Sequence, residues 1–223
     1  MLGPARPPSP VTLAGRYATL VPFDAAAHGD ALWAAQDESV WTYFGYGPFP
    51  SAAAYRAFMT PLAATSDPVF LTVLVDGSPR GVVSYLRIDP QHAVVEIGHI
   101  WYAPSVQRSR VTTEVAYLLA RHAFDDLGHR RLEWKCNALN ARSRAAAERL
   151  GFTYEGTFRQ HMIVKGGNRD TAWFSLLDGE WPAVRAALEA WLDSANFDAG
   201  GRQRSALNAA SASTNVWSGS SRS

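Results

Sequence analysis

The stretch that decides the fold is Leu132-Glu-Trp-Lys-Cys-Asn-Ala-Leu-Asn140-Ala-Arg-Ser143-Arg-Ala-Ala-Ala-Glu-Arg-Leu-Gly151-Phe152. Its first five residues alternate apolar and polar side chains, which predicts a half-buried strand at 132–136. Asn140 is then a suitable N-cap for a helix from Ser143 to Leu150, and Gly151 is placed to end that helix. A strand followed at once by a capped helix and a second strand indicates an α/β domain.

Strand and helix signals alternate outward from this stretch. Strands are predicted at residues 16–23, 69–75, 81–88, 94–102, 153–158 and 171–177. Helices are predicted at 24–36, at 51–60 up to Pro61, at 111–127 before Gly128, and from 180 onward. Asp24 is the expected N-cap of the first helix, and Asp76-Gly77 has the chemistry of a hairpin turn. This order predicts an α/β (α+β) fold with a mixed sheet and helices on both faces.

Composition excludes several classes of protein. Of 223 residues, 47% are hydrophobic, which is enough for a sizeable core. Lys and Arg total 21 against 20 Asp and Glu, so the chain has no basic excess for nucleic acid or an anionic membrane. No run approaches the roughly 18 apolar residues of a membrane helix. Cys136 is a single cysteine, which fits a reducing compartment, and a cytoplasmic location is expected.

The two ends of the chain differ in composition from the middle. Residues 1–10 are predicted to be an extended, Pro-rich leader without the apolar core of a signal peptide. Residues 196–223 are rich in Ser, Ala, Gly and Asn and are predicted to be a disordered tail. The folded domain is therefore expected to span residues 11–195.

The segment from Ile100 to Glu114 reads as strand, proline, polar loop and helix. A helix N-terminus offers free N–H groups and a partial positive charge to a phosphate. Arg108, Ser109 and Arg110 would add two cations and a hydroxyl at this point. The same residues equally suit a solvated loop before an ordinary helix, and spacing alone leaves both interpretations open.

A set of ordered motifs goes beyond spacing. The set is Asn140-x-x-Ser143, Leu150-Gly151-Phe152, Glu155-Gly156, Arg159 and Arg169-Asp170. Together these residues resemble the RimJ/RimL-like branch of the GCN5-related N-acetyltransferases (GNAT), and the resemblance covers about residues 11–193. It implies a mostly antiparallel sheet splayed by a cofactor cleft between strands 94–102 and 131–137, with acetyl-CoA as co-substrate.

The resemblance also implies positions for acetyl-CoA. Backbone groups of Ile100, Trp101 and Tyr102 would hold the pantetheine arm, and an N–H near Trp101 would meet the oxyanion. Asn140 would contact the pantetheine, and Ser143 would face the sulfur. The loop expected to hold the pyrophosphate comprises Gln107, Arg108, Ser109, Arg110, Val111 and Thr112. This loop departs from the family's Gln/Arg-x-x-Gly-x-Gly/Ala pattern, because it has no glycine.

Amine attack requires a deprotonated amine, and an α-amino group, with a reference pKa of about 7.7–8.0, asks less of a base than lysine at about 10.4. Glu96 and Glu155 are the two candidate bases, and either could instead be a structural partner of an arginine. The acceptor is expected to contact His161 and an aromatic segment, although these residues could equally be a hairpin histidine and plain core. The aromatic residues are Trp41, Tyr43, Phe44, Tyr46 and Phe49.

The sequence predicts an N-acetyltransferase that moves acetyl from acetyl-CoA to a primary amine by direct attack in a ternary complex. The acceptor would be a protein N-terminus or a small-molecule amine. The six histidines show no metal-ligand spacing, so no metal is expected. The alternative is a non-catalytic acyl-CoA-binding protein that kept the fold, and a homodimer is a further hypothesis.

Overall fold

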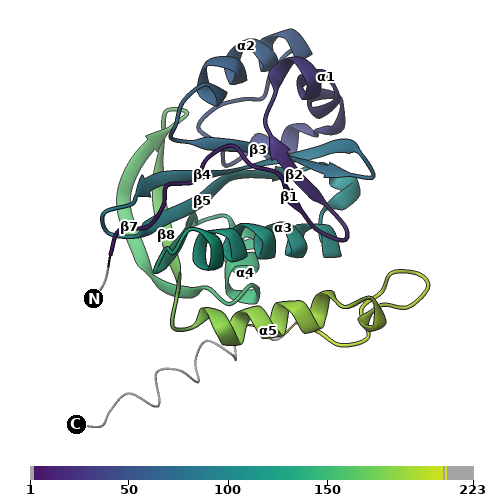
Figure 1. The fold of residues 1–223 in the computed structure, drawn as a ribbon. Helices are drawn as coiled ribbons and strands as arrows, with labels where there is room; N and C mark the ends of the chain where they lie inside the picture. Colours follow the sequence, from purple (N-terminus) through teal and green to yellow (C-terminus); the bar gives the residue numbers. More distant parts are fainter. Residues whose placement is uncertain (1–2, 208, 210–223) are drawn as a thin grey trace.

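The computed structural model describes residues 3–207 and residue 209. An eight-stranded sheet lies at its centre, in the order β1-β2-β3-β4-β5-β6-β8-β7. The strands are β1 (Leu13–Ala14), β2 (Thr19–Pro22), β3 (Val69–Val75), β4 (Ser78–Asp89), β5 (Val94–Tyr102), β6 (Arg131–Asn137), β7 (Thr153–Val164) and β8 (Gly167–Leu177). The helices are α1 (Ala25–Ala35), α2 (Ala52–Ala63), α3 (Arg110–Arg121), α4 (Ala141–Arg149) and α5 (Trp181–Leu192). Figure 1 shows α1 and α2 on one face of the sheet and α3, α4 and α5 on the other, which confirms the predicted α/β class.

All strand pairs of this sheet are antiparallel except β5 with β6. The parallel pairing starts at Val94 opposite Arg131 and ends at Ile97 opposite Trp134. Both strands continue beyond that point, β5 to Tyr102 and β6 to Asn137, without pairing to each other. The predicted splay between these two strands is therefore present.

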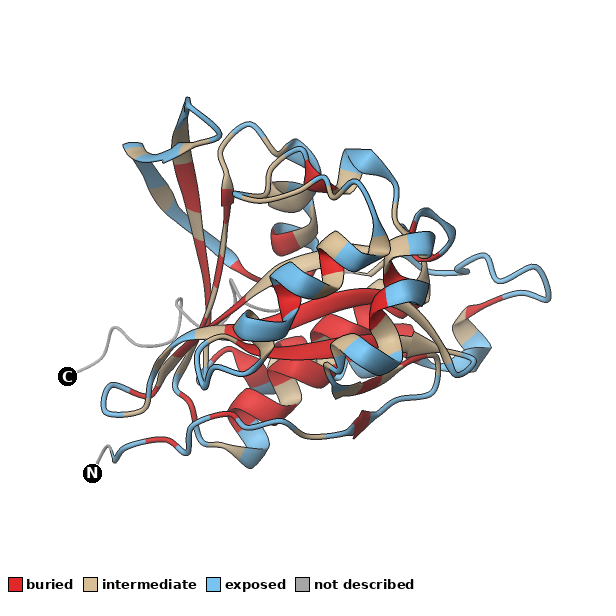
Figure 2. Cartoon of the chain, turned by 90° about the horizontal axis from the view of Figure 1, so that it is seen from above, coloured by how far each residue is buried: buried red, intermediate tan, exposed pale blue. Residues whose placement is uncertain are grey.

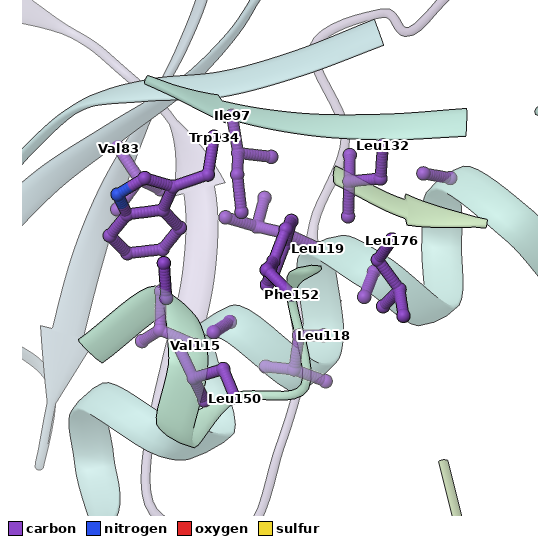
Figure 3. Packing of buried hydrophobic residues seen from close by; sticks show 14 of the residues in the cluster. Val83, Ile97, Val115, Leu118, Leu119, Leu132, Trp134, Leu150, Phe152 and Leu176 are labelled. Atoms are coloured by element: carbon purple, nitrogen blue, oxygen red, sulfur yellow. The ribbon is translucent and has the colours of Figure 1, made fainter. Parts of the chain in front are cut away.

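Two apolar clusters hold the layers together. The larger one fills the space between the sheet and helices α3, α4 and α5, and Figure 3 shows Trp134 within it, beside Val115 and Leu150. The smaller one lies under α1 and α2 and includes Leu32, Trp41 and Phe70. The middle of the sheet is buried, at residues 69–73 of β3, 81–85 of β4 and 95–97 of β5 (Figure 2), so burial from both faces stabilises it.

Local signals set most helix ends as the sequence predicts. Asp24 accepts hydrogen bonds from the backbone N–H groups of Ala26 and Ala27 at the start of α1. Helix α2 is the exception, because it runs through Pro61 to Ala63 instead of stopping before the proline. Pro61 stands in the last turn and removes one N–H from the helix hydrogen bonds, and the packing of the following Leu62 against the smaller cluster offsets this cost.

The chain ends are more ordered than their composition predicts. In the leader, the N–H of Ala5 donates to the carbonyl of Pro90, and that of Arg6 donates to the carbonyl of Leu127, at 2.9 Å each. Beyond residue 195, Phe197 is buried against Trp191, so the described part of the fold continues past the predicted boundary. A single aromatic ring can anchor a polar segment that composition alone assigns to a tail. Residues 208 and 210–223 of the predicted tail lie outside the described residues.

Candidate active site

Strand β5, which borders the splay, carries a bulge in its pairing with β4. Val82 of β4 pairs with Trp101 and Ser84 pairs with Gly98, so two residues of β5 oppose Val83 alone. The first of these two, His99, has a φ of 49°. A bulge of this kind removes backbone groups from the ladder and redirects them. The predicted pantetheine and oxyanion contacts of Ile100, Trp101 and Tyr102 fall on this irregular part of the strand.

The predicted phosphate loop ends in a well-formed helix start. Ser109 is the N-cap of α3, and its Oγ accepts from the N–H of Val111 at 3.2 Å. The remaining N–H groups of the first turn have no partner within the helix, as in any α-helix. Arg108 has a φ of 55°, so the loop contains a left-handed backbone conformation at a residue that is not glycine. The Gln107 amide donates to the carbonyl of Tyr102 at 2.9 Å and closes the loop onto the end of β5.

The guanidinium of Arg110 lies over aromatic rings. Its central carbon is 4.2 Å from the ring centroid of Tyr17 and 5.4 Å from that of Phe197. Within the described residues Arg110 has no acidic partner, and Arg108 in the loop has none either. The amino end of α3 therefore carries two arginines that form no ion pair among the described residues, which suits the binding of a phosphate group.

Ser143 lies in the first turn of α4, beneath β6. The indole N–H of Trp134 donates to Ser143 Oγ at 2.9 Å, and Asn140 Oδ1 accepts from the N–H of Ser143 at 3.1 Å. Asn140 is thus the N-cap that the sequence predicts. Burial raises the pKa of the nearby Cys136 thiol, an effect that Ser143 partly offsets by hydrogen bonding. Cys136 is therefore a neutral core residue rather than a nucleophile.

Glu96 lies on the opposite face of the sheet, one residue before the last β5–β6 pair. It is 5% exposed, and its Oε2 is 3.0 Å from Lys135 Nζ and 3.1 Å from Arg87 Nε. Burial raises the pKa of Glu96, whereas Lys135 and then Arg87 lower it. The carboxylate is thus held by cations yet less acidic than an ordinary glutamate.

Glu155 makes the structural pair that was the alternative interpretation of the sequence. Both of its oxygens accept from the Arg131 guanidinium, at 2.7 and 2.6 Å, and Oε1 also accepts from Ser175 Oγ at 2.7 Å. The bonds from Arg131 lower the pKa of Glu155, and Ser175 adds to that effect. A bidentate pair of this kind leaves little capacity to take a proton near neutral pH.

The aromatic segment that precedes α2, residues 41–49, lies partly in the core and partly at the surface. Trp41 is 1% exposed and packs against Trp101 of β5, with ring centroids 5.8 Å apart. Phe44, Tyr46 and Phe49 surround Trp41 and are half-buried. The core interpretation therefore holds for Trp41, and the other three rings lie between this core and the surface.

Three contacts join this segment to distant elements. The hydroxyl of Tyr43 donates to the carbonyl of Leu139 at 3.1 Å, which links the segment to the loop between β6 and α4. Lys165, in the turn between β7 and β8, donates to the carbonyl of Trp41 at 2.9 Å. The hydroxyl of Tyr46 lies 2.8 Å from Nδ1 of His99 on the β5 bulge. The aromatic segment therefore meets the splay and the β7–β8 hairpin.

His161 is placed on that hairpin, 2.9 Å from the hydroxyl of Thr171 and beside the rings of Phe158 and Trp173. The Trp173 ring in turn lies 3.6 Å below Lys135 Nζ. Sequence reasoning missed Lys135 and His99. The alternation Arg131, Glu133, Lys135 in one strand was the available signal for the first, whereas nothing local pointed to the second.

Surface hollows lie away from the splay. One of about 700 Å³ is lined by Arg159, Gln160, Asn168 and Asp170 on the β7–β8 hairpin. Another of about 350 Å³ lies between the β1–β2 turn, α3 and α5. Among the described residues, no cluster of three or more His, Cys, Asp or Glu could hold a metal ion. In the same part of the chain, every helix is too short or too polar to cross a bilayer.

The model of the acetyltransferase (GNAT) domain family matches residues 18–153. The chain therefore belongs to the GNAT acetyltransferase family, and it is an acyltransferase that acts on an amine with acetyl-CoA as the donor used by that family.

Two curated relatives and one solved structure are similar to this chain. The chain is 32% identical over 145 residues to "Putative ribosomal N-acetyltransferase YdaF" of Bacillus subtilis, which covers 63% of this chain and 78% of that protein. It is 34% identical over 80 residues to the ribosomal-protein-serine acetyltransferase of Escherichia coli, but this match spans only 36% of the chain and 44% of that protein. A crystal structure of a GCN5-related N-acetyltransferase from Brucella melitensis aligns with a TM-score of 0.90 and 42% identity, covering 92% of this chain and 96% of that one.

Proposed function

We propose that this enzyme acetylates the α-amino group of a protein N-terminus, with a ribosomal protein as the acceptor class. Two relatives named for ribosomal acetylation support the acceptor class. The observation that carries the reaction is the end of β5–β6 pairing at Ile97 and Trp134. Ser143 and Glu96 lie on opposite faces of the sheet at that point, so a thioester between the strands would have one polar group on each side.

The end of β5 and the start of α3 form the side of the site that would bind acetyl-CoA. The first turn of α3, with Arg108 and Arg110, would bind the diphosphate through free N–H groups and guanidinium groups. Backbone groups of Ile100 to Tyr102 on the bulged strand would hold the pantetheine arm, together with Asn140. Acetyl-CoA supplies an activated acyl group with a thiolate as leaving group, and the side chains of this chain orient it.

Ser143 is proposed to stabilise the departing thiolate. Its oxygen accepts from Trp134, which leaves the hydroxyl proton directed away from the indole and available to the sulfur. A positioned donor of this kind acts mainly on charge that develops in the transition state. Ser143 should therefore matter more for turnover than for the binding of acetyl-CoA.

Glu96 is the carboxylate that we propose as general base. Desolvation raises its pKa, which moves it toward the range in which a carboxylate can take a proton from an amine near neutral pH. Glu155 is the weaker candidate, because Arg131 engages both of its oxygens. An α-amino acceptor also fits, since its pKa of about 7.7–8.0 asks far less of Glu96 than a lysine would.

The acceptor would approach on the face that carries Tyr43, Tyr46 and the β7–β8 hairpin. Phe158 is 53% exposed beside His161, and apolar groups exposed next to polar ones are typical of surfaces that bind peptides. Phe44 and Phe49 would support this surface from behind, over Trp41. A partly exposed acceptor side fits a protein terminus better than an enclosed small-molecule site would.

The test is thiol release from acetyl-CoA with a panel of peptides that carry ribosomal-protein N-termini, with the product confirmed by a mass increase of one acetyl group. Matched peptides with a blocked α-amino group and a free lysine are the control. Acetylation of the unblocked peptides alone supports the proposal. Acetylation of lysine or of small amines only would overturn the acceptor assignment, and binding of acetyl-CoA without any thiol release would favour the non-catalytic alternative.

A further inference from the structure

The segment that follows α5 is built into the fold. Phe197 forms a bridge with Gln203, and the indole N–H of Trp191 donates to Gln203 Oε1 at 2.9 Å. Asn196 binds both backbone groups of Ser205 through its side chain. These contacts fold residues 193–207 back on themselves and hold the ring of Phe197 in a buried position. The segment lies outside residues 18–153, which the family model matches.

The ring of Phe197 forms one wall around Arg110, the first residue of α3. Tyr17 forms the other wall, with its ring 6.3 Å from that of Phe197. Tyr17 is itself fixed, because Glu114 of α3 accepts from the N–H groups of Arg16, Tyr17 and Ala18 at 2.7, 2.6 and 2.8 Å. Because the two rings are inclined at 73°, the guanidinium can lie flat on only one of them while the other ring limits its movement, and its N–H donors stay free in the plane.

A second arginine has the same kind of support. The guanidinium carbon of Arg149, at the end of α4, lies 4.8 Å from the Trp191 ring centroid. Its Nη1 donates to Thr113 Oγ1 in the first turn of α3 at 3.0 Å. Burial lowers the pKa of Arg149, and no carboxylate among the described residues offsets that cost. Two arginines held by aromatic rings at a helix amino end leave an excess of positive charge that an anion would stabilise.

We propose that Phe197 is a positioning residue for acetyl-CoA, which holds the Arg110 guanidinium at the amino end of α3 so that its free N–H groups bind the phosphates. The inference rests on the proposed acetyl-CoA site and assigns part of it to the C-terminal segment. It also accounts for the loop without glycine. Where relatives with glycine bring backbone close to phosphate, this chain uses an arginine that needs a ring to orient it.

The experiment compares wild type with Phe197→Leu, which keeps an apolar side chain but removes the ring. Both are assayed with acetyl-CoA and with S-acetylpantetheine, which has the thioester but neither the diphosphate nor the adenosine. We expect KM for acetyl-CoA to rise about tenfold with kcat within about twofold. The kcat/KM for S-acetylpantetheine should stay within about twofold, and Phe197→Tyr should restore the wild-type KM. Phe23→Leu is the matched control, because it removes a half-buried ring on the face of the sheet that α1 and α2 cover.

A coupling measurement covers the case in which Phe197→Leu folds poorly. Arg110→Gln keeps the helix and should raise KM for acetyl-CoA by a similar factor, and adding Phe197→Leu to it should raise KM no further. Independent, multiplicative effects of the two changes would overturn the proposal, as would an equal loss with both donors. If the wild type neither binds nor uses acetyl-CoA, the proposed function fails as well. If the wild type is active and Phe197→Leu matches it, only this inference fails.

Discussion

Trp134 donates its indole N–H to the hydroxyl oxygen of Ser143 across 2.9 Å, from the sheet to the first turn of α4. The indole nitrogen can only donate a hydrogen bond. The Ser143 oxygen is therefore the acceptor in this bond, and the Ser143 hydroxyl proton is free to be donated elsewhere. The ring of Trp134 is 8% exposed within the larger core and cannot easily move. A core residue therefore orients a hydroxyl that the proposed reaction needs.

Replacing Ser143 by Ala should lower kcat about tenfold and leave KM for acetyl-CoA within about twofold, because a donor to the thiolate acts in the transition state. Steady-state thiol release at saturating acceptor checks this. Trp134→Phe, which keeps an aromatic ring but loses the donor, should show a smaller decrease in kcat. An unchanged kcat for Ser143→Ala removes the hydroxyl from the mechanism.

Glu96→Gln should lower kcat/KM about 100-fold at neutral pH, since a positioned general base contributes on the order of 10²–10⁴. The measurement is a pH profile of kcat/KM for both proteins, with circular dichroism to confirm the fold. The acidic limb of the wild-type profile should be absent in the variant. Equal profiles for the two proteins would mean that solvent takes the proton instead.

Glu155→Gln should preserve kcat while reducing the free energy of unfolding by about 1 kcal/mol, the upper range for a partly exposed ion pair. The pairing with Arg131 lowers the pKa of Glu155 from its ordinary 4.5. The stabilisation is therefore complete above pH 4.5 and is lost as the pH falls through the lowered pKa. Urea unfolding at pH 7 and pH 3 tests this. A large loss of kcat would mean that Glu155 acts as a general base.

His99 should stay neutral at unusually low pH. Burial lowers its pKa from 6.5 to about 4, and burial also raises the pKa of Tyr46, so the tyrosine hydroxyl donates to a neutral ring. Because the unfolded chain binds this proton first, stability should fall as the pH drops from 6.5 toward 4. Titration of the ring protons by NMR, assigned with His99→Gln, should give a midpoint of about 4. A midpoint near 6.5 contradicts the buried pair.

Arg108→Gly should raise the free energy of unfolding by about 1 kcal/mol, since the left-handed φ of 55° costs a non-glycine residue about that much. Arg108→Ala provides the comparison, because alanine keeps the strain and should show no gain. Thermal unfolding of the three proteins measures both. Equal stability of the glycine and alanine variants would show that the loop conformation carries no strain.

Short-range chemistry explains why much of the fold could be predicted. The N-caps Asp24 and Asn140 act within three residues of themselves, and strands such as 69–75 and 94–102 are set by their own apolar patterns. The β7–β8 turn is equally local, with Lys165 and Gly166 both at positive φ. The prediction at Pro61 was wrong because tertiary packing of the following turn outweighed a local stop signal.

The candidate site also has a part that the sequence indicated and a part that only tertiary contacts decided. Sequence motifs indicated Ser143, Glu155 and the loop before α3, and Glu96 was a candidate from its place in the strand beside the expected cofactor. The sequence left Glu155 and Glu96 equivalent as bases. The difference between the two carboxylates comes from partners that stand far away in the chain, Arg131 for one and Lys135 for the other. The burial that separates their pKa values is likewise a property of the packed sheet.

By itself the sequence determined most of the helices and strands, their order and the family, because caps, turns and apolar periodicity act over a few residues. Only the tertiary structure decided which side chains meet: Tyr46 with His99, Trp134 with Ser143, and Phe197 with Arg110. Each of these contacts joins residues from different elements, which meet only when the helices and loops pack on the sheet. No local sequence pattern encodes them.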